Sequence, residues 1–230
     1  MEFNKKQPAL LYLDKNGFYY YQTGLPSVIS LAFLATSVKD MDVINGASII
    51  NQVKSFIDQY HIPLAIITII VSPNITFEKD FVDLTSDALE EKTKNFIETI
   101  PFESVMTKQY PIENGVKVIG WNEELYLELK VSFEKYAFIV EHVIPYQLLG
   151  SDQALIQNLT QDNALQLLKR VDHLKQFTML TIQKEKIPTV QEQEDKKDKK
   201  PKAKKTRLYA MAVVFIILFG FLGYMLLKQH

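Results

Sequence analysis

The residues that first suggest chemistry form a short turn near the N-terminus, in the stretch LYLDKNGFYYYQ at positions 11–22. Asp14, Asn16 and Gly17 lie between two runs of apolar and aromatic residues. Such a turn can simply join two strands, because Asn and Gly tolerate the positive φ that tight hairpins need. A glycine-containing turn after a strand can also offer backbone amides to the phosphate of a nucleotide. We interpret this turn as a hairpin, since a hairpin alone explains its residues.

Other residues capable of chemistry are scattered and form no known pattern. The sequence contains no GxxxxGKS/T, GxGxxG, HExxH or GxSxG motif, and it contains no cysteine that could supply a disulfide or a thiolate ligand. We expect the carboxylates to lie on surfaces and the histidines not to bind metal: Glu90, Glu91, Glu98, Glu103, Glu123, Glu124, His61, His142, His173 and His230. The sequence therefore predicts no catalytic residue, no cofactor and no metal site, and hence no enzymatic activity.

Charge is distributed unevenly along the chain. Residues 1–183 contain 15 Lys+Arg and 22 Asp+Glu, a net charge of -7, whereas residues 184–207 contain 10 and 5, a net charge of +5. The acidic part argues against nucleic acid as a partner, because binding DNA or RNA requires neutralised phosphates. The aromatic run at 18–21 could stack on bases. In an acidic domain we interpret it as a half-buried strand.

The segment 208–227 reads LYAMAVVFIILFGFLGYMLL and contains no charged residue over its 20 positions. A helix of this length spans roughly 30 Å, about the thickness of the hydrocarbon core of a bilayer. Eight basic residues lie at 196–207, whereas only Lys228 follows the segment, so the positive-inside rule places residues 1–207 in the cytoplasm. We expect a single-pass protein of the inner cell membrane with a cytoplasmic N-terminal domain.

Two segments separate this expected anchor from the N-terminal domain. Residues 184–207 contain two prolines, many charges and few large apolar side chains, as in a disordered linker. Residues 151–183 are expected to form a helical extension, in which positions 160–181 carry an apolar stripe: Ala164, Leu167, Leu168, Val171, Leu174, Phe177 and Leu180. We expect this amphipathic helix to pack on the domain. Binding to a partner or to a second copy is the alternative.

The first 72 residues predict the element order β-β-β-α-β. Three short strands are expected at 8–13, 18–22 and 27–34. A helix then begins with Asp42 as its cap and ends near Tyr60. The run LAIITIIVS after Pro63 lacks alternation, as expected for a strand that is buried on both faces. A ribonuclease H-like lobe begins in this way, with a meander, a crossover helix and a strand parallel to the first.

A second group of elements follows. We expect a helix at 81–100, strands at 105–110 and 116–121, a helix capped by Asn122, and a strand at 138–145. These elements suggest a small α+β module, about residues 81–137, inserted into a domain that covers residues 1–150. The predicted fold class is therefore α/β (α+β): a ribonuclease H-like lobe with an inserted subdomain, followed by a disordered linker and one transmembrane helix.

Several stretches of residues 1–150 resemble the N-terminal half of actin-like pilus and secretion assembly proteins of the PilM and GspL type. One is the opening hairpin LLYLDKNGFYYYQ, and another is PLAIITIIVS, which is similar to the segment before the inserted subdomain of that family. The others are the acidic helix that ends in TIPFE and the stretch VKVIGWNEELYLELKVSFEKYAFIVEHVIPYQLL. The resemblance implies an actin-like N-terminal lobe, truncated and degenerate.

The sequence departs from that family at the first turn. The family has Asp-x-Gly-Ser or Asp-x-Gly-Thr there, and the backbone amides and the hydroxyl contact phosphate. In this chain Gly17 comes one residue later and Phe18 stands where the hydroxyl is expected. The family also has a second lobe with the adenosine pocket, for which we expect no room in residues 151–230. GspL-type members continue across the membrane after their span, whereas three residues follow it here.

The resemblance and the expected anchor together predict a membrane-anchored, non-catalytic scaffold subunit of a type IV pilus-like or type II secretion-like assembly machine. Its expected partners are inner-membrane platform proteins, with a homo-oligomer as a further option. Two alternatives stay open. One is a tail-anchored adaptor that recruits an unrelated cytoplasmic partner, and the other is a reduced actin-like ATPase that binds ATP through Asp14.

Overall fold

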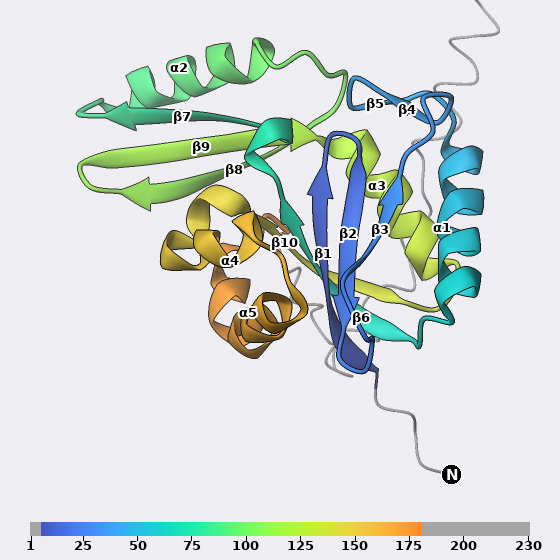
Figure 1. Cartoon of the computed structure of the whole chain (residues 1–230). Helices are drawn as coiled ribbons and strands as arrows, with labels where there is room; N and C mark the ends of the chain where they lie inside the picture. The colour runs from blue at the N-terminus through green and yellow to red at the C-terminus, as the bar shows by residue number, and fades with distance from the viewer. Residues whose placement is uncertain (1–5, 181–230) are drawn as a thin grey trace, which may run out of the picture. The chain divides into compact units, whose positions relative to one another are not determined.

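A computed structural model of the chain describes residues 6–180. Its main sheet has five strands in the order β10-β6-β1-β2-β3 (Figure 1). The strands are β1 (Gln7–Asp14), β2 (Gly17–Gln22), β3 (Ile29–Ala32), β6 (Ala65–Val71) and β10 (Ile139–Pro145). The predicted linker at 184–207 and the predicted membrane span at 208–227 lie outside the described residues. Within residues 6–180, no helix has the length and apolar character needed to cross a bilayer.

The main sheet has the strand order that the sequence predicts for a ribonuclease H-like lobe. β1 and β2 are antiparallel neighbours, and β3 continues the meander. After α1 (Gly46–Tyr60), β6 pairs with β1 in parallel, and β10 later pairs with β6 in parallel. The α/β class is confirmed, and the order β-β-β-α-β holds for the main sheet, although a small two-stranded hairpin that was not predicted lies between β3 and α1. The carboxyl ends of the three parallel strands consequently lie at one edge of the sheet.

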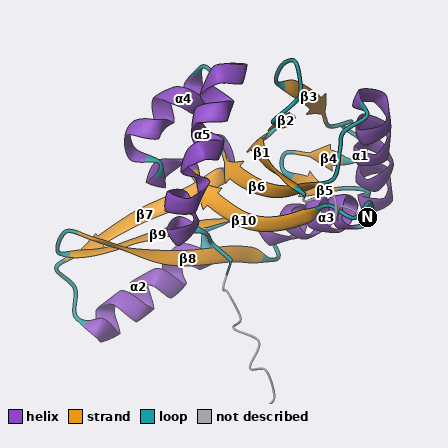
Figure 2. Cartoon of the chain, turned by 90° about the horizontal axis from the view of Figure 1, so that it is seen from below, coloured by secondary structure: helices purple, strands orange, loops and turns teal. Residues whose placement is uncertain are grey.

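The two faces of the main sheet carry separate cores, because side chains alternate along each strand. Leu11 and Leu13 belong to the core on the side of α1 and α3 (Glu123–Glu134). Leu10 and Tyr21 belong to the opposite core, with α5 (Gln161–Leu174) and the short α4 (Gln153–Gln157). Figure 2 shows α3 and α5 on opposite sides of the sheet. β6 is largely buried on both faces, as its uninterrupted apolar run predicts.

The first helix begins later than the sequence predicts. Asn45 is its N-cap, and the Asn45 side chain accepts a hydrogen bond from the N–H of Ser48 at 3.0 Å. The expected cap, Asp42, lies instead in a small hairpin of β4 (Val38–Lys39) and β5 (Asp42–Val43). Asn and Asp cap helices about equally well, so the cap residue alone does not choose between the two positions. The buried residues of the helix are Ile49, Val53 and Phe56.

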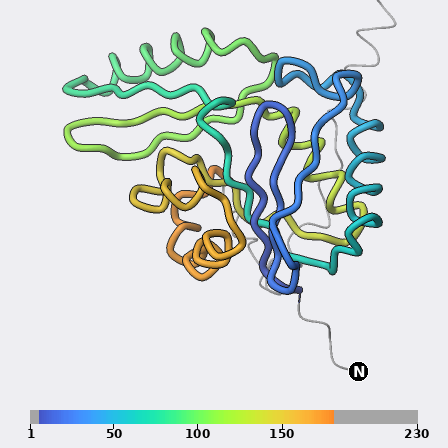
Figure 3. The backbone as a smooth tube through the Cα atoms, viewed as in Figure 1, coloured from blue at the N-terminus to red at the C-terminus, as the bar shows by residue number. Residues whose placement is uncertain are grey.

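A second, three-stranded sheet lies between β6 and α3 in the chain (Figure 3). It has the order β7-β9-β8 and is antiparallel throughout, with β7 (Thr76–Val82), β8 (Val105–Ile112) and β9 (Gly115–Asn122). The expected helix at 81–100 is shorter, because α2 covers Ser86–Glu98 and positions 81 and 82 belong to β7. We call β7, α2, β8 and β9 the inserted module. α3 packs beside α1 on the main sheet.

The amphipathic helix near residue 170 also ends earlier than predicted. After α5, a 3-10 turn covers Lys175–Phe177, and residues 178–180 then run along β10. The N–H of Val143 donates to Thr178 Oγ1 at 3.0 Å, and the N–H of Met179 donates to Val143 O at 2.6 Å. We call residues 178–180 the terminal strap. α5 itself packs on the main sheet, which confirms that this helix docks on its own domain.

Candidate functional site

The carboxyl edge of the main sheet is the first place to look for a site, because open α/β sheets bind ligands at the carboxyl ends of their strands. β1 ends at Asp14, and its last positions are in register with the last positions of β6 and β10. Ser72 follows β6 directly, and Tyr146 follows β10 directly. The sheet therefore brings these three residues to one edge. Only Asp14 was singled out from the sequence.

Hydrogen bonds hold the Asp14 side chain in place. Its Oδ1 accepts from the backbone N–H of Lys15 at 2.9 Å and from Nδ2 of Asn74 at 3.2 Å. The backbone N–H of Asn74 in turn donates to Ser72 Oγ at 3.1 Å. These bonds connect the β1–β2 turn to the segment that follows β6. Asp14 thus acts as a structural acceptor within the domain.

The other side chains near Asp14 at the carboxyl edge of the sheet carry neutral hydroxyls and amides. Burial raises the pKa of Tyr12, a hydrogen bond with Ser72 opposes that shift, and the nearby charge of Asp14 adds to it. Gln147 Nε2 donates to Thr76 Oγ1 at 2.7 Å. General acid–base catalysis near neutral pH needs groups with suitably placed pKa values, and the raised pKa of Tyr12 takes this phenol further from that range. In the part of the chain that the structure describes, no cluster of three His, Cys, Asp or Glu residues could hold a metal ion.

The turn between β1 and β2 is closed by the neighbouring strand β3. Gly17 has a φ of 150°, and a Cβ at this position would lie only 2.0 Å from Leu31 O. The N–H of Phe33 donates to Asn16 O at 2.9 Å. A hollow of about 170 Å³ remains beside Asp14, whereas small-molecule sites typically have roughly 300–1,000 Å³. The register pairs Asp14 with Gly17 across a two-residue turn, so the hairpin interpretation is confirmed.

Phe18 belongs to the core and not to the edge of the sheet. Its side chain is only 1% exposed. Its ring centroid lies 5.2 Å from that of Phe56 and 5.8 Å from that of Phe133. A hydroxyl at position 18 would therefore point into an aromatic cluster. Phe18, the residue that departs from the phosphate-binding pattern, therefore packs in the core of the domain.

The histidines that the sequence singled out lie apart from one another. His61 ends α1 with a φ of 48°, His142 is buried in β10, and His173 is exposed on α5. His230 lies outside the described residues. Five of the singled-out carboxylates lie on helices and one lies in a loop: Glu90, Glu91 and Glu98 on α2, Glu123 and Glu124 on α3, and Glu103 between α2 and β8. The structure does not bring these groups together.

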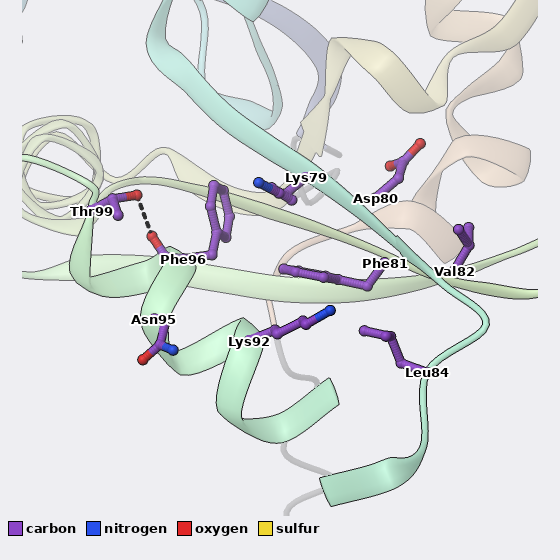
Figure 4. A pocket seen from close by; sticks show the side chains of 9 residues that line it. All are labelled: Lys79, Asp80, Phe81, Val82, Leu84, Lys92, Asn95, Phe96 and Thr99. Atoms are coloured by element: carbon purple, nitrogen blue, oxygen red, sulfur yellow. Dashed lines mark hydrogen bonds between the residues drawn. The ribbon is translucent and has the colours of Figure 1, made fainter. Parts of the chain in front are cut away.

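The inserted module carries a larger hollow, of about 510 Å³, between β7 and α2 (Figure 4). The rings of Phe81 and Phe96 line it, with their centroids 6.3 Å apart. Lys79 from β7 and Lys92 from α2 also line it, and neither forms an ion pair within residues 6–180. Apolar rings beside two cations suit binding.

Sequence reasoning missed both this hollow and the terminal strap. The hollow depends on β7, and the charged run Glu78, Lys79 and Asp80 hides the alternation of this strand. The strap has no strand pattern of its own, because it is defined by its bonds to β10. The signal that could have revealed β7 is the pair Phe77 and Phe81, which flank Lys79 on the same face of the strand.

No family model and no curated protein sequence matches this chain. Solved structures do show similarity, and one of them is a PilM–PilN type IV pilus biogenesis complex. In that case the identity is 10%, the TM-score is 0.43, and the match covers 65% of this chain and 51% of that chain. A second is the cytoplasmic domain of EpsL, an inner-membrane component of the type II secretion system of Vibrio cholerae. Here the identity is 14%, the TM-score is 0.36, and the match covers 61% of this chain and 58% of that chain.

A third similar structure is a Bacteroides thetaiotaomicron protein with an actin-like ATPase fold and unknown function. The identity is 12%, the TM-score is 0.36, and the match covers 68% of this chain and 59% of that chain. These are the kinds of protein that the sequence resembles. The chain spans less than two thirds of the length of each of the three structures.

Proposed function

We propose that this chain is a membrane-anchored, non-catalytic scaffold subunit of a type IV pilus-like or type II secretion-like assembly machine. The observation that carries the proposal is the order of the main sheet, with a meander, a crossover helix and two parallel strands interrupted by the inserted module. The same order, read from residues 1–150, underlies the resemblance to PilM- and GspL-type proteins. A fold alone does not fix a function, so the edge of the sheet has to be considered as well.

The geometry of the carboxyl edge supports the non-catalytic part of the proposal. Asp14 is held by Lys15 and Asn74, and Phe18 fills the core where a phosphate-binding turn would carry a hydroxyl. The backbone of β3 closes the turn at Gly17. The Lys15 N–H already donates to Asp14 Oδ1, so a nucleotide phosphate would have to displace the Asp14 carboxylate to bind that amide. We infer that the lobe has kept an actin-like framework for interactions with other proteins.

The proposed location rests on the sequence of residues 184–227. The uncharged segment at 208–227 and the basic run before it support a location of the domain on the cytoplasmic side of the inner membrane. Extraction of membranes with alkaline carbonate tests this placement. We expect the full-length chain to stay in the membrane pellet and a chain that ends at residue 183 to appear in the supernatant. Release of the full-length chain would contradict the anchor.

Nucleotide binding separates the scaffold from the reduced ATPase. We expect the full-length protein in detergent micelles to show no binding of Mg-ATP at millimolar concentration by isothermal titration calorimetry. Binding that is lost in Asp14→Ala and kept in Asp87→Ala would support the ATPase instead. Asp87 is a suitable control because it is an exposed carboxylate on α2, far in the chain from the β1–β2 turn.

The partner class is tested by affinity capture of the tagged full-length protein from detergent-solubilised native membranes, followed by mass spectrometry. We expect a pilus or secretion platform protein, an assembly ATPase or a pilin-like subunit. Recovery of unrelated soluble proteins alone would favour the tail-anchored adaptor. In that case the actin-like framework would be a shared fold without a shared function.

A further inference from the structure

The outer side of β7 is an open strand edge within the part of the chain that the structure describes. The N–H of Asp83 donates to Asn114 O at 3.0 Å, just beyond the last pair of the β7–β9 ladder. Because inward and outward groups alternate along an antiparallel strand, the N–H and C=O groups of Glu78, Asp80 and Val82 point to the open side. Such an edge can add a further extended chain by main-chain hydrogen bonds.

An apolar floor lies next to this edge. Phe81 is 6% exposed, and its ring packs edge-on against Phe96 of α2, with an angle of 72° between the ring planes. Leu84 lies at the rim of the same hollow (Figure 4). The volume of about 510 Å³ falls in the range of roughly 300–1,000 Å³ that is typical of ligand sites. The hollow can therefore take an apolar side chain from a strand that pairs with β7, since alternate side chains of that strand point to this face.

Two lysines that form no ion pair with any of residues 6–180 flank the apolar floor. Figure 4 shows Lys92 extending from α2 toward β7, and Lys79 beside Phe96. The third lysine of these two elements, Lys94, forms an ion pair with Glu98 at 4.0 Å. Asp80 is the one carboxylate among the lining residues, and it lies 2.9 Å from Lys117. The lining of the hollow therefore carries two lysines and one carboxylate, and that carboxylate already has a cation in Lys117, although residues 1–183 are acidic as a whole.

We propose that the hollow between β7 and α2 is a docking site for an extended segment of a partner protein that carries a carboxylate next to an apolar side chain. The partner strand pairs with the open edge of β7, its apolar side chain contacts Phe81 and Phe96, and its carboxylate lies between Lys79 and Lys92. This inference deepens the proposed function, because a scaffold works through such surfaces. Binding of such a segment can be measured on the purified protein, without a bilayer and without other components of an assembly machine.

A partner protein fits this surface better than a second copy of the chain. Antiparallel pairing of two β7 edges would bring Lys79 and Lys92 of both copies to one interface, and like charges at an interface are unfavourable. A segment rich in Asp or Glu would instead bring opposite charges next to Lys79 and Lys92, which is favourable. The charge of the hollow therefore selects the occupant, while the strand edge supplies main-chain hydrogen bonds that do not depend on sequence.

The test uses the full-length protein in detergent micelles and a phage-displayed library of random heptapeptides. Peptides that also bind the double variant Lys79→Glu/Lys92→Glu are removed. We expect the remaining peptides to share Asp or Glu beside Val, Ile or Phe. A fluorescein-labelled version of the most enriched peptide is then titrated by fluorescence anisotropy. Charge reversal at both lysines should weaken its binding at least about tenfold, and Lys94→Glu, the matched control on α2, should leave it unchanged.

The strand pairing is tested separately. Val82→Pro removes an outward N–H and leaves the ladder to β9 intact, so it should abolish binding. Methylation of alternate backbone nitrogens in the peptide blocks the same pairing and does not depend on folding of a variant. Enriched peptides without acidic residues, or binding that survives both the charge reversal and the methylation, would overturn the proposal. A dimer of the wild-type chain that dissociates in Val82→Pro would overturn it in favour of self-pairing. None of these outcomes affects the capture experiment on the proposed function.

Discussion

Replacing Gly17 with alanine tests whether β3 closes the β1–β2 turn. A Cβ at position 17 would lie 2.0 Å from Leu31 O and 2.9 Å from the Cα of Ala32, so the backbone of β3 has to move. A non-glycine residue at this φ adds strain of about 1–3 kcal/mol. Overpacking of a well-packed region adds about 1–3 kcal/mol more. We therefore expect Gly17→Ala to lower the free energy of unfolding by about 2–6 kcal/mol.

Gly24→Ala is the matched control for this experiment. Gly24 also has a positive φ, of 99°, but no atom lies within 4 Å of where its Cβ would be. For Gly24→Ala the free energy of unfolding should therefore fall only by the cost of backbone strain, about 1–3 kcal/mol. The difference between the two variants isolates the contact with β3 from the cost of the backbone conformation.

Urea unfolding of the full-length chain in detergent micelles measures both variants. Trp121 is the only tryptophan of the chain and is 0% exposed, so its fluorescence reports on the core. With a slope of about 2 kcal/mol per molar urea, Gly17→Ala should lower the midpoint by about 1–3 M. Equal losses for the two variants would refute the reasoning. The backbone of β3 would then not restrict position 17.

Three further predictions concern pH, the terminal strap and the ion pair between the half-exposed Arg170 and the buried Asp152. Burial lowers the pKa of His142 from its usual 6.5. The unfolded chain therefore takes up the proton at a higher pH than the folded chain does. The free energy of unfolding should consequently fall as the pH drops below about 6.5. His142→Gln should flatten that part of a profile of stability against pH, and an unchanged slope would contradict this origin. Thr178→Val removes the acceptor of the Val143 N–H, and a loss of about 1–2 kcal/mol should speed hydrogen exchange of that amide roughly 5–30-fold; unchanged protection would show that the strap is not held there. Arg170→Ala leaves the side chain of Asp152, which is 8% exposed, without its cation, and urea unfolding should show a loss of about 1–3 kcal/mol. Arg170→Lys should lose less, and equal losses would mean that the charge of Arg170 does not matter.

The main sheet could be predicted from the sequence because local signals and the global fold agree. The uninterrupted run of β6 marks a central strand, and the turn chemistry between β1 and β2 marks a hairpin. Asn122 caps α3 as predicted, and its side chain accepts from the N–H of Leu125 at 3.2 Å. Each of these signals lies within a few neighbouring residues, so a single sequence is sufficient to read it.

The remainder depends on contacts that a linear pattern does not contain. β7 was missed because Lys79 interrupts the apolar pattern on the face that carries Phe81. A charged lysine is tolerated there because Lys79 lies on an edge strand and stays exposed. Of the cluster at the carboxyl edge, the sequence offered Asp14 alone. Asn74 joins that cluster because the parallel register of β1 and β6 places it there. The docking hollow likewise exists only once α2 lies beside β7.

The terminal strap decides where tension enters the domain. Thr178 and Met179, near the end of the described residues, are bonded to Val143 in β10. Tyr110 of β8 also donates to the O atom of Phe177 at 2.9 Å. A pull that arrives from the C-terminal side is therefore carried by the main sheet and by the inserted module at once, before α5 bears any of it. Drawing the strap away would loosen both sheets together, so a load on the following chain is a mechanical input to the whole domain.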